Sequence, residues 1–293
     1  MKRVAVIGLG GIARKAYLPT LAARPLDLHL MTRSRFTLDA VADTHRVPSD
    51  RRFTTLDELI GSGIDAAFVH VPTTAHLTVV PRLLDAGVAT YVDKPLDTTL
   101  EGSRELVEHA ARAGVPLMVG FNRRHAPAYT GALDHPRDLI VLQKNQPSGS
   151  GPVREVIYDD FIHVADTLRF LAPGPIRGSH VSGRVSGGVL EHVALTLTGE
   201  GFTAIGLMHR LGGSKEEKLE LSGRGRKREI LNLTDVIDHH GPVARQPIDG
   251  WASVANQRGF EQICTEFLEG RHPGLNDALL THELCEKVVT SLS

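Results

Sequence analysis

In the first 120 residues, short apolar runs alternate with longer stretches whose apolar residues recur at helical spacing. The runs are rich in Val, Ile, Leu and Ala, which is typical of strands buried inside a sheet. They cover residues 3–7, 26–31, 66–71, 88–92 and 116–119. Strands that alternate with helices in this way predict an α/β fold with a parallel, doubly wound sheet.

Beyond residue 121 the apolar segments follow one another with Gly-rich connections and few helices between them. Segments of this kind read as successive strands. They cover residues 139–143, 176–185, 189–197, 202–209, 218–222 and 229–233. A helical pattern interrupts them at 159–171, and two more helices, 254–269 and 276–291, are expected to close the chain.

The length of 293 residues predicts two domains, each with its own core. Lys and Arg number 33 against 34 Asp and Glu, so the formal net charge is -1. This balance argues against binding to nucleic acid or to an anionic membrane, and we interpret the basic run at 224–228 as a solvated hairpin turn. No apolar run has the roughly 18 residues that a membrane span needs. The N-terminal run is too short for a signal peptide, so we expect a cytoplasmic protein. Cys264 and Cys285 lack metal-ligand spacing, and no metal is expected.

The first strand leads into a G-x-G-x-x-A turn made of Gly8, Gly10, Gly11, Ile12 and Ala13. The first glycine permits a tight turn, the second lets the backbone approach a pyrophosphate, and the alanine allows close packing of strand and helix. The following helix offers free N–H groups to the phosphates. The motif predicts a dinucleotide site, although a glycine turn of any α/β protein has the same pattern.

The end of the second strand carries Thr32, Arg33 and Ser34, where an NAD-binding domain would place a carboxylate. A carboxylate would repel a 2′-phosphate, whereas an arginine and hydroxyls bind one. We therefore expect NADP(H), with NAD(H) as the alternative. Alternatively, Arg33 and Arg35 belong to an exposed loop and bind nothing.

Ligands of doubly wound sheets bind beyond the carboxyl ends of the strands. Pro72, Thr73 and His76 follow one strand and are further candidates for cofactor binding. Lys94 follows the next strand and precedes Pro95, which keeps it extended at the rim of the sheet. Lys94 is either a cation beside cofactor and substrate or an ordinary surface lysine.

The helical pattern at 159–171 contains Asp159, His163 and Asp166. Spacings of four and three residues place their side chains on one helix face. A histidine beside carboxylates can transfer a proton near neutral pH, and we expect Asp166 to fix its tautomer. A capping aspartate with a half-buried histidine explains the same residues equally well.

Three motifs, Gly8–Ala13, Asp93-Lys94-Pro95 and Asp159-x-x-x-His163, occur in the order and at the separations typical of the Gfo/Idh/MocA oxidoreductases, a family that the chain resembles over nearly its whole length. Gly8–Pro19, Val92–Leu96, Val119–Arg124 and Gln257–Phe260 are most similar to its MviM-type members. The chain departs from the family in having Asp93 where a glutamate is usual, and Phe161-Ile162 where small residues precede the histidine.

The resemblance implies a Rossmann domain, residues 1–120, and a substrate-binding and oligomerisation domain, 121–293, with an open, mainly antiparallel sheet. It implies a homodimer or homotetramer. By this resemblance Lys94 contacts substrate and nicotinamide ribose, His163 accepts the proton, and Asp159 orients the substrate or its partner.

Five further residues are candidates for substrate binding, and two of them have a simpler explanation. A lone tryptophan is more often core packing, and Arg258 fits an exposed helix charge. The candidates are Asn122, Arg123, Arg124, Trp251 and Arg258.

These observations predict an enzyme that transfers hydride between NADP(H) and a secondary alcohol or ketone of a sugar, cyclitol or related polyol. The alternatives are a regulator that senses the cofactor without chemistry, and a nicotinamide-dependent lyase or glycosidase. The partner in each case is a small molecule.

Overall fold

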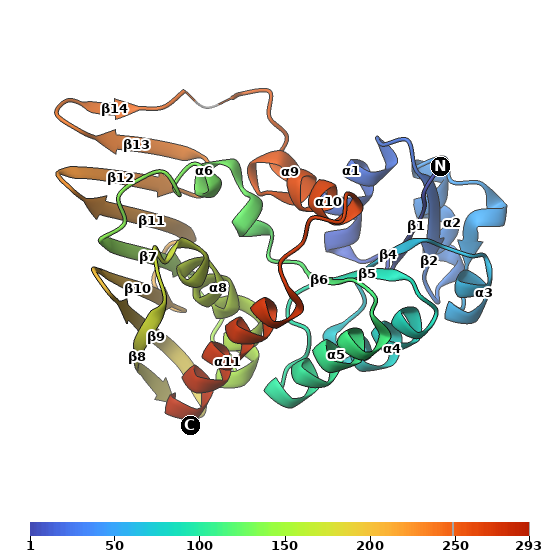
Figure 1. Ribbon diagram of the computed structural model, residues 1–293, viewed down its shortest axis with the longest axis horizontal. Helices are drawn as coiled ribbons and strands as arrows, with labels where there is room; N and C mark the ends of the chain where they lie inside the picture. The colour runs from blue at the N-terminus through green and yellow to red at the C-terminus, as the bar shows by residue number, and fades with distance from the viewer. Residues whose placement is uncertain (248, 293) are drawn as a thin grey trace. The chain divides into compact units, whose positions relative to one another are not determined.

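The computed structural model describes residues 1–247 and 249–292, which separate into two compact units (Figure 1). The first unit comprises Met1–Gly120 and Phe260–Leu280, and the second comprises Phe121–Gly259 and the residues from Thr281 onward. The expected continuous domains, 1–120 and 121–293, therefore need one correction: the segment 260–280 belongs with the first unit.

The first unit is built on a six-stranded parallel sheet in the order β3-β2-β1-β4-β5-β6. Its strands are β1 (Arg3–Ile7), β2 (Asp27–Met31), β3 (Arg52–Phe53), β4 (Ala66–Val69), β5 (Ala89–Val92) and β6 (Leu117–Val119). The order reverses between β1 and β4, and the carboxyl ends of these strands mark the place where such sheets bind ligands. The predicted doubly wound sheet is confirmed.

Helices connect these strands. They are η1 (Ala13–Tyr17), α1 (Leu18–Ala22), α2 (Arg35–Thr44), η2 (Ser49–Arg51), α3 (Leu56–Gly61), η3 (Thr73–Ala75), α4 (His76–Asp85) and α5 (Leu100–Ala113).

A helix from the distant part of the chain, α10 (Phe260–Leu268), completes the core of the first unit. Its Ile263, Cys264 and Phe267 are buried in the same apolar cluster as the strands, and the Phe267 ring lies 5.0 Å from that of Phe68. Burial of this apolar face against the sheet is the reason that 260–268 belongs to the first unit.

The second unit contains an eight-stranded sheet in the order β14-β13-β12-β11-β7-β10-β9-β8. The strands are β7 (Leu139–Asn145), β8 (Ile176–Ser186), β9 (Val189–Gly199), β10 (Phe202–His209), β11 (Glu216–Gly223), β12 (Arg226–Leu231), β13 (Asp235–His239) and β14 (Val243–Arg245). Within the sheet β7 and β10 are parallel, and the other neighbouring pairs are antiparallel. This agrees with the open, mainly antiparallel sheet that the resemblance implied.

The helices of the second unit lie before, between and after these strands. They are η4 (Asn122–His125), α6 (Pro127–Thr130), α7 (Val153–Val156), η5 (Ile157–Phe161), α8 (Ile162–Leu171) and α9 (Val254–Gln257), while α11 (Leu275–Leu292) crosses the division between the units. Helix α8 packs closely on β10, and the absence of a side chain at Gly206 permits this. A Cβ at Gly206 would lie 2.5 Å from Val164 and 2.8 Å from Leu168. Within residues 1–247 and 249–292, no helix combines the length and the hydropathy needed to cross a bilayer.

Candidate functional site

The glycine turn after β1 has the form that a dinucleotide requires. Gly8 has φ +89, and a Cβ there would lie 2.7 Å from the carbonyl carbon and oxygen of His70, so only glycine fits. Gly10 and Gly11 instead face open space, because a Cβ at either position would meet no described atom within 4 Å. Ile12 is exposed and Ala13 is fully buried against the core. Backbone open to solvent at a helix start suits a pyrophosphate.

Two of the three motifs singled out for function include residues of a π-helical turn. The first helix begins with η1, directly after the glycine turn, and Asp159 lies in η5. Such turns are rare and occur frequently at functional sites. Asp159 lies in the π-helical turn η5 and His163 in the α-helix that follows it, α8, so the shared face expected for the two side chains stays a prediction.

The end of β2 carries Arg33, an exposed cation. Its guanidinium forms no ion pair within the described parts of the chain. Ser34 caps α2, its Oγ accepting from the Thr37 N–H at 3.2 Å, and Arg35 pairs with Asp39 at 2.9 Å. Of the three residues expected to bind the cofactor here, Ser34 thus has a structural role as a helix cap. Thr32 and Arg33 are the residues available to a ligand.

His76 is not placed as a direct ligand of a cofactor, which corrects our expectation. Its side chain is buried, and both ring nitrogens face backbone carbonyls. Nδ1 lies 3.0 Å from the Leu96 oxygen and 3.1 Å from that of Pro95, while Nε2 lies 3.2 Å from the Val71 oxygen. Burial lowers the pKa of His76. The imidazole therefore ties the turn after β4, which contains Pro72 and Thr73, to the turn after β5.

Lys94 leaves the carboxyl end of β5 and is half-buried. Its peptide bond to Pro95 is cis. The side chain of the preceding Asp93 is held by His70, whose Nδ1 lies 2.7 Å from Asp93 Oδ2. The lysine is thus positioned at the edge where ligands of this sheet type bind.

A buried polar cluster beneath the glycine turn was not predicted. The hydroxyls of Tyr17 and Tyr91 are 2.6 Å apart, and the Tyr17 ring lies 4.2 Å from that of His70. Burial raises the pKa of both tyrosines well above their usual range. The sequence signal for this cluster was His70, a histidine in the otherwise apolar run 66–71, and we did not single it out from the sequence.

In the second unit, Asp159 is exposed and His163 is half-buried at the start of α8. The expected role of Asp166 in fixing the tautomer of His163 is wrong, because this carboxylate has other partners. Arg124 donates to both of its oxygens, at 2.9 Å and 2.5 Å, and the Thr281 hydroxyl donates to Oδ1 at 2.9 Å. Arg124, predicted to bind substrate, is thereby placed in a buried ion pair.

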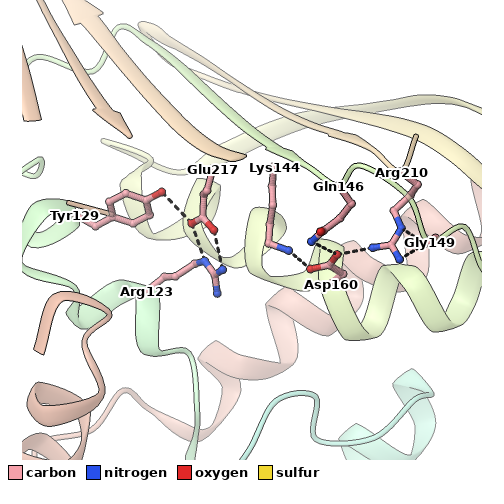
Figure 2. A network of polar contacts seen from close by, with 8 residues as sticks. All are labelled: Arg123, Tyr129, Lys144, Gln146, Gly149, Asp160, Arg210 and Glu217. Carbon is pink, nitrogen blue, oxygen red and sulfur yellow. Dashed lines mark hydrogen bonds and ion pairs between the residues drawn. The ribbon is translucent and has the colours of Figure 1, made fainter. Parts of the chain in front are cut away.

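Arg123 is also placed in a structural ion pair and not at a surface (Figure 2). Its guanidinium donates to both oxygens of Glu217 at 2.8 Å and 2.7 Å, and the Tyr129 hydroxyl donates to the same carboxylate at 3.0 Å. Burial by itself would raise the pKa of Glu217, but the charge and hydrogen bonds of Arg123 outweigh it and lower that pKa.

A second carboxylate in Figure 2, Asp160 of η5, binds Lys144 of β7, Gln146 of the loop between β7 and α7, and Arg210, which directly follows β10. Lys144 and Arg210 both donate to it, and Arg210 Nη1 lies 2.5 Å from Oδ2. Arg210 Nε also donates to the Gly149 carbonyl at 2.7 Å, which fastens the loop. Sequence reasoning missed this network because its members come from separate parts of the chain.

The remaining substrate candidates have different environments. Asn122 is buried and its Nδ2 donates to the Arg258 carbonyl at 2.8 Å, so its amide has a structural partner. The Arg258 side chain is exposed, as an ordinary helix charge would be. Trp251 is 99% exposed, which rules out the core-packing interpretation.

By itself, the first unit is a dinucleotide-binding domain, and the second unit carries ionisable side chains on a helix over an open sheet. Comparison with known proteins agrees that the first unit is a dinucleotide-binding domain. Residues 2–121 match the oxidoreductase family with an NAD-binding Rossmann fold, GFO_IDH_MocA, and residues 133–240 match the YceM-like C-terminal domain.

Relatives extend the match over the chain. It is 32% identical over 278 residues to YceM of Salmonella typhimurium, covering 91% of this chain and 88% of that protein. It is 32% identical over 210 residues to a D-apiose dehydrogenase of Paraburkholderia graminis, covering 66% and 54%. The crystal structure of a dehydrogenase (MviM) from Clostridium difficile superposes with a TM-score of 0.91 at 28% identity, covering 99% of each chain. The chain belongs to the Gfo/Idh/MocA family and is an oxidoreductase.

Proposed function

We propose that this enzyme transfers hydride between NADP(H) and a secondary alcohol or ketone of a sugar, cyclitol or related polyol. The observation that carries the proposal is the position of Lys94, directly beyond β5 on the edge of the sheet that bears the glycine turn. The name of the D-apiose dehydrogenase relative, which refers to a sugar, supports the substrate class.

The cofactor-binding residues are Gly8, Gly10, Gly11, Ile12 and Ala13 at the turn, with Pro72 and Thr73 beyond β4. The preference for NADP(H) over NAD(H) rests on Thr32 and Arg33. No carboxylate stands at positions 32–35 to accept from a ribose 2′-hydroxyl, and Arg33 carries a positive charge that a 2′-phosphate would bind.

The bound nicotinamide supplies the group that accepts or donates hydride. In the oxidative direction His163 accepts the hydroxyl proton of the substrate, because an imidazole can exchange a proton near neutral pH. Lys94 contacts the nicotinamide ribose and stabilises negative charge on the substrate oxygen, while Asp159 orients the substrate. Trp251 and Arg258, both exposed, are the candidates left for further substrate contacts.

We also propose that the enzyme works as a homodimer or homotetramer and takes only small-molecule partners. Light scattering of the purified protein measures the first of these directly.

The test of the function is a panel of polyols with NADP⁺ and of keto-sugars with NADPH, followed by the absorbance of the reduced nicotinamide at roughly 340 nm. We expect net, stoichiometric turnover with at least one substrate, and a lower Kd for NADPH than for NADH. Tighter NADH binding would contradict the cofactor preference. Turnover without net change in cofactor would instead favour a lyase or glycosidase.

A further inference from the structure

The turn that carries Lys94 is held by two imidazoles that come from one stretch of chain beyond β4. His70 binds the Asp93 side chain, with 2.7 Å between Nδ1 and Oδ2. His76 binds the backbone on the other side of the lysine, at the Leu96 oxygen, 3.0 Å from Nδ1. Lys94 thus lies between two anchored positions of the chain.

Packing alone does not account for a histidine at position 70. The side chain is fully buried, and its Nε2 has no hydrogen-bond partner among the described residues. Its ring lies 4.2 Å from that of Tyr17, an environment that a phenyl ring would fill without burying an unpaired nitrogen. The hydrogen bond to Asp93 is what an imidazole adds at this position.

Asp93 is also fixed through its backbone, since its N–H donates to the Val69 carbonyl at 3.1 Å. With both the backbone and the side chain of Asp93 held, little freedom remains in the peptide from which Lys94 extends. The acceptor is a carboxylate, so Nδ1 of His70 carries the proton in this bond.

We propose that His70 is a positioning residue for Lys94, acting through Asp93 to hold the lysine at the cofactor. The inference rests on the proposed function, in which Lys94 contacts the nicotinamide ribose. It adds a residue that touches neither the substrate nor the cofactor.

A double-mutant cycle in NADPH binding tests this. His70→Phe keeps the ring beside Tyr17 and removes the donor, whereas His70→Asn places an amide N–H near the position of Nδ1. Lys94→Met removes the group that His70 is proposed to position. Kd values for NADPH are measured by titration for the wild type, each variant and the His70→Phe/Lys94→Met double variant.

We expect His70→Phe to weaken NADPH binding about tenfold, because the misplaced Lys94 ammonium loses its hydrogen bond to the ribose, and a bond to a charged group is worth about this much. His70→Asn should restore most of the affinity. In the Lys94→Met background, His70→Phe should then have no further effect. Additive losses, or equal losses in His70→Phe and His70→Asn, would overturn the role of His70 alone. A wild-type protein that binds neither NADPH nor NADH would overturn the proposed function, and this inference with it.

Discussion

Arg124 and Asp166 form a two-point ion pair inside the second unit, with Nε 2.9 Å from Oδ2 and Nη2 2.5 Å from Oδ1. The two side chains are 10% and 2% exposed. The Thr281 hydroxyl donates to the same carboxylate, so the pair connects η4, α8 and α11. A buried pair of this kind fixes the relative positions of its elements and leaves an unpaired charge if it is broken.

Arg124→Gln should therefore destabilise the protein by about 3–5 kcal/mol, since it leaves the Asp166 carboxylate buried without its cation. Arg177→Gln is the matched control, because Arg177 pairs with Glu200 on the surface, where the side chains are 69% and 85% exposed. That change should cost no more than about 1 kcal/mol. Urea unfolding followed by circular dichroism gives both values, and equal values would show that the buried pair has no special role.

The Arg123–Glu217 pair should make stability depend on pH in the acid range. Burial favours protonation of Glu217, but Arg123 outweighs it, and the pKa in the folded state lies below the usual 4.5. The stabilisation is therefore fully present above about pH 4.5 and is lost as the pH falls through the lower, folded-state pKa. Glu217→Gln removes the titrating group, so the difference in unfolding free energy between it and the wild type should shrink below pH 4.5. A difference that stays constant from pH 7 to pH 3 would contradict the assignment.

Gly259 should tolerate no side chain. Its φ is +80, and a Cβ would lie 2.2 Å from the Asn122 oxygen and 2.6 Å from the Ala126 nitrogen. Gly259→Ala should cost more than about 3 kcal/mol, because backbone atoms would have to move. Gly270 has φ +74 but no described atom near its Cβ position, so Gly270→Ala isolates the backbone term, about 1–2 kcal/mol. Similar thermal shifts in the two variants would contradict a steric role for Gly259.

The fold could be predicted from the sequence because its information is local. Apart from the two-residue β3, the strands of the first sheet are mainly apolar runs, and the glycine turn depends on neighbouring residues. Two strands of the second sheet, β13 and β14, were missed; they are only five and three residues long, so little alternation of apolar and polar residues marks them. The predicted helix 254–269 is divided at Gly259, and only three-dimensional packing determines which unit its second half joins.

The roles of the arginines could not be predicted, because their partners are far away in the chain. Arg123 binds Glu217, 94 residues further on, and Arg124 binds Asp166, 42 residues further on. Both arginines follow the end of a strand, which indicated a ligand site. In the folded chain each is buried against a distant carboxylate and binds it. The exposed Arg33 at the end of β2 has no such partner in the described ranges, and its role at a 2′-phosphate stays a prediction.

Arg33→Gln should weaken NADPH binding by roughly 10- to 100-fold and leave NADH binding nearly unchanged, because only NADPH has the 2′-phosphate. Arg35→Gln is the matched control: it removes a neighbouring charge that is already paired with Asp39. The test is to measure the Kd values for NADPH and NADH with the wild type, Arg33→Gln and Arg35→Gln. Equal losses for NADPH in both variants would indicate a general electrostatic effect and not a specific contact.

His163→Ala should lower kcat by about 10²- to 10⁴-fold, the usual contribution of a general base, and leave the Kd for NADPH within about twofold. The reason is that the proposed role of His163 lies in proton transfer, while the cofactor-binding residues belong to the first unit. His240→Ala, which removes an exposed histidine of the second unit, should change neither quantity. Measurement uses the substrate found in the panel, with fluorescence titration of NADPH alongside. A His163→Ala protein that loses cofactor affinity as strongly as turnover would show that the histidine supports the structure of the site, and the proton acceptor would then have to be sought elsewhere.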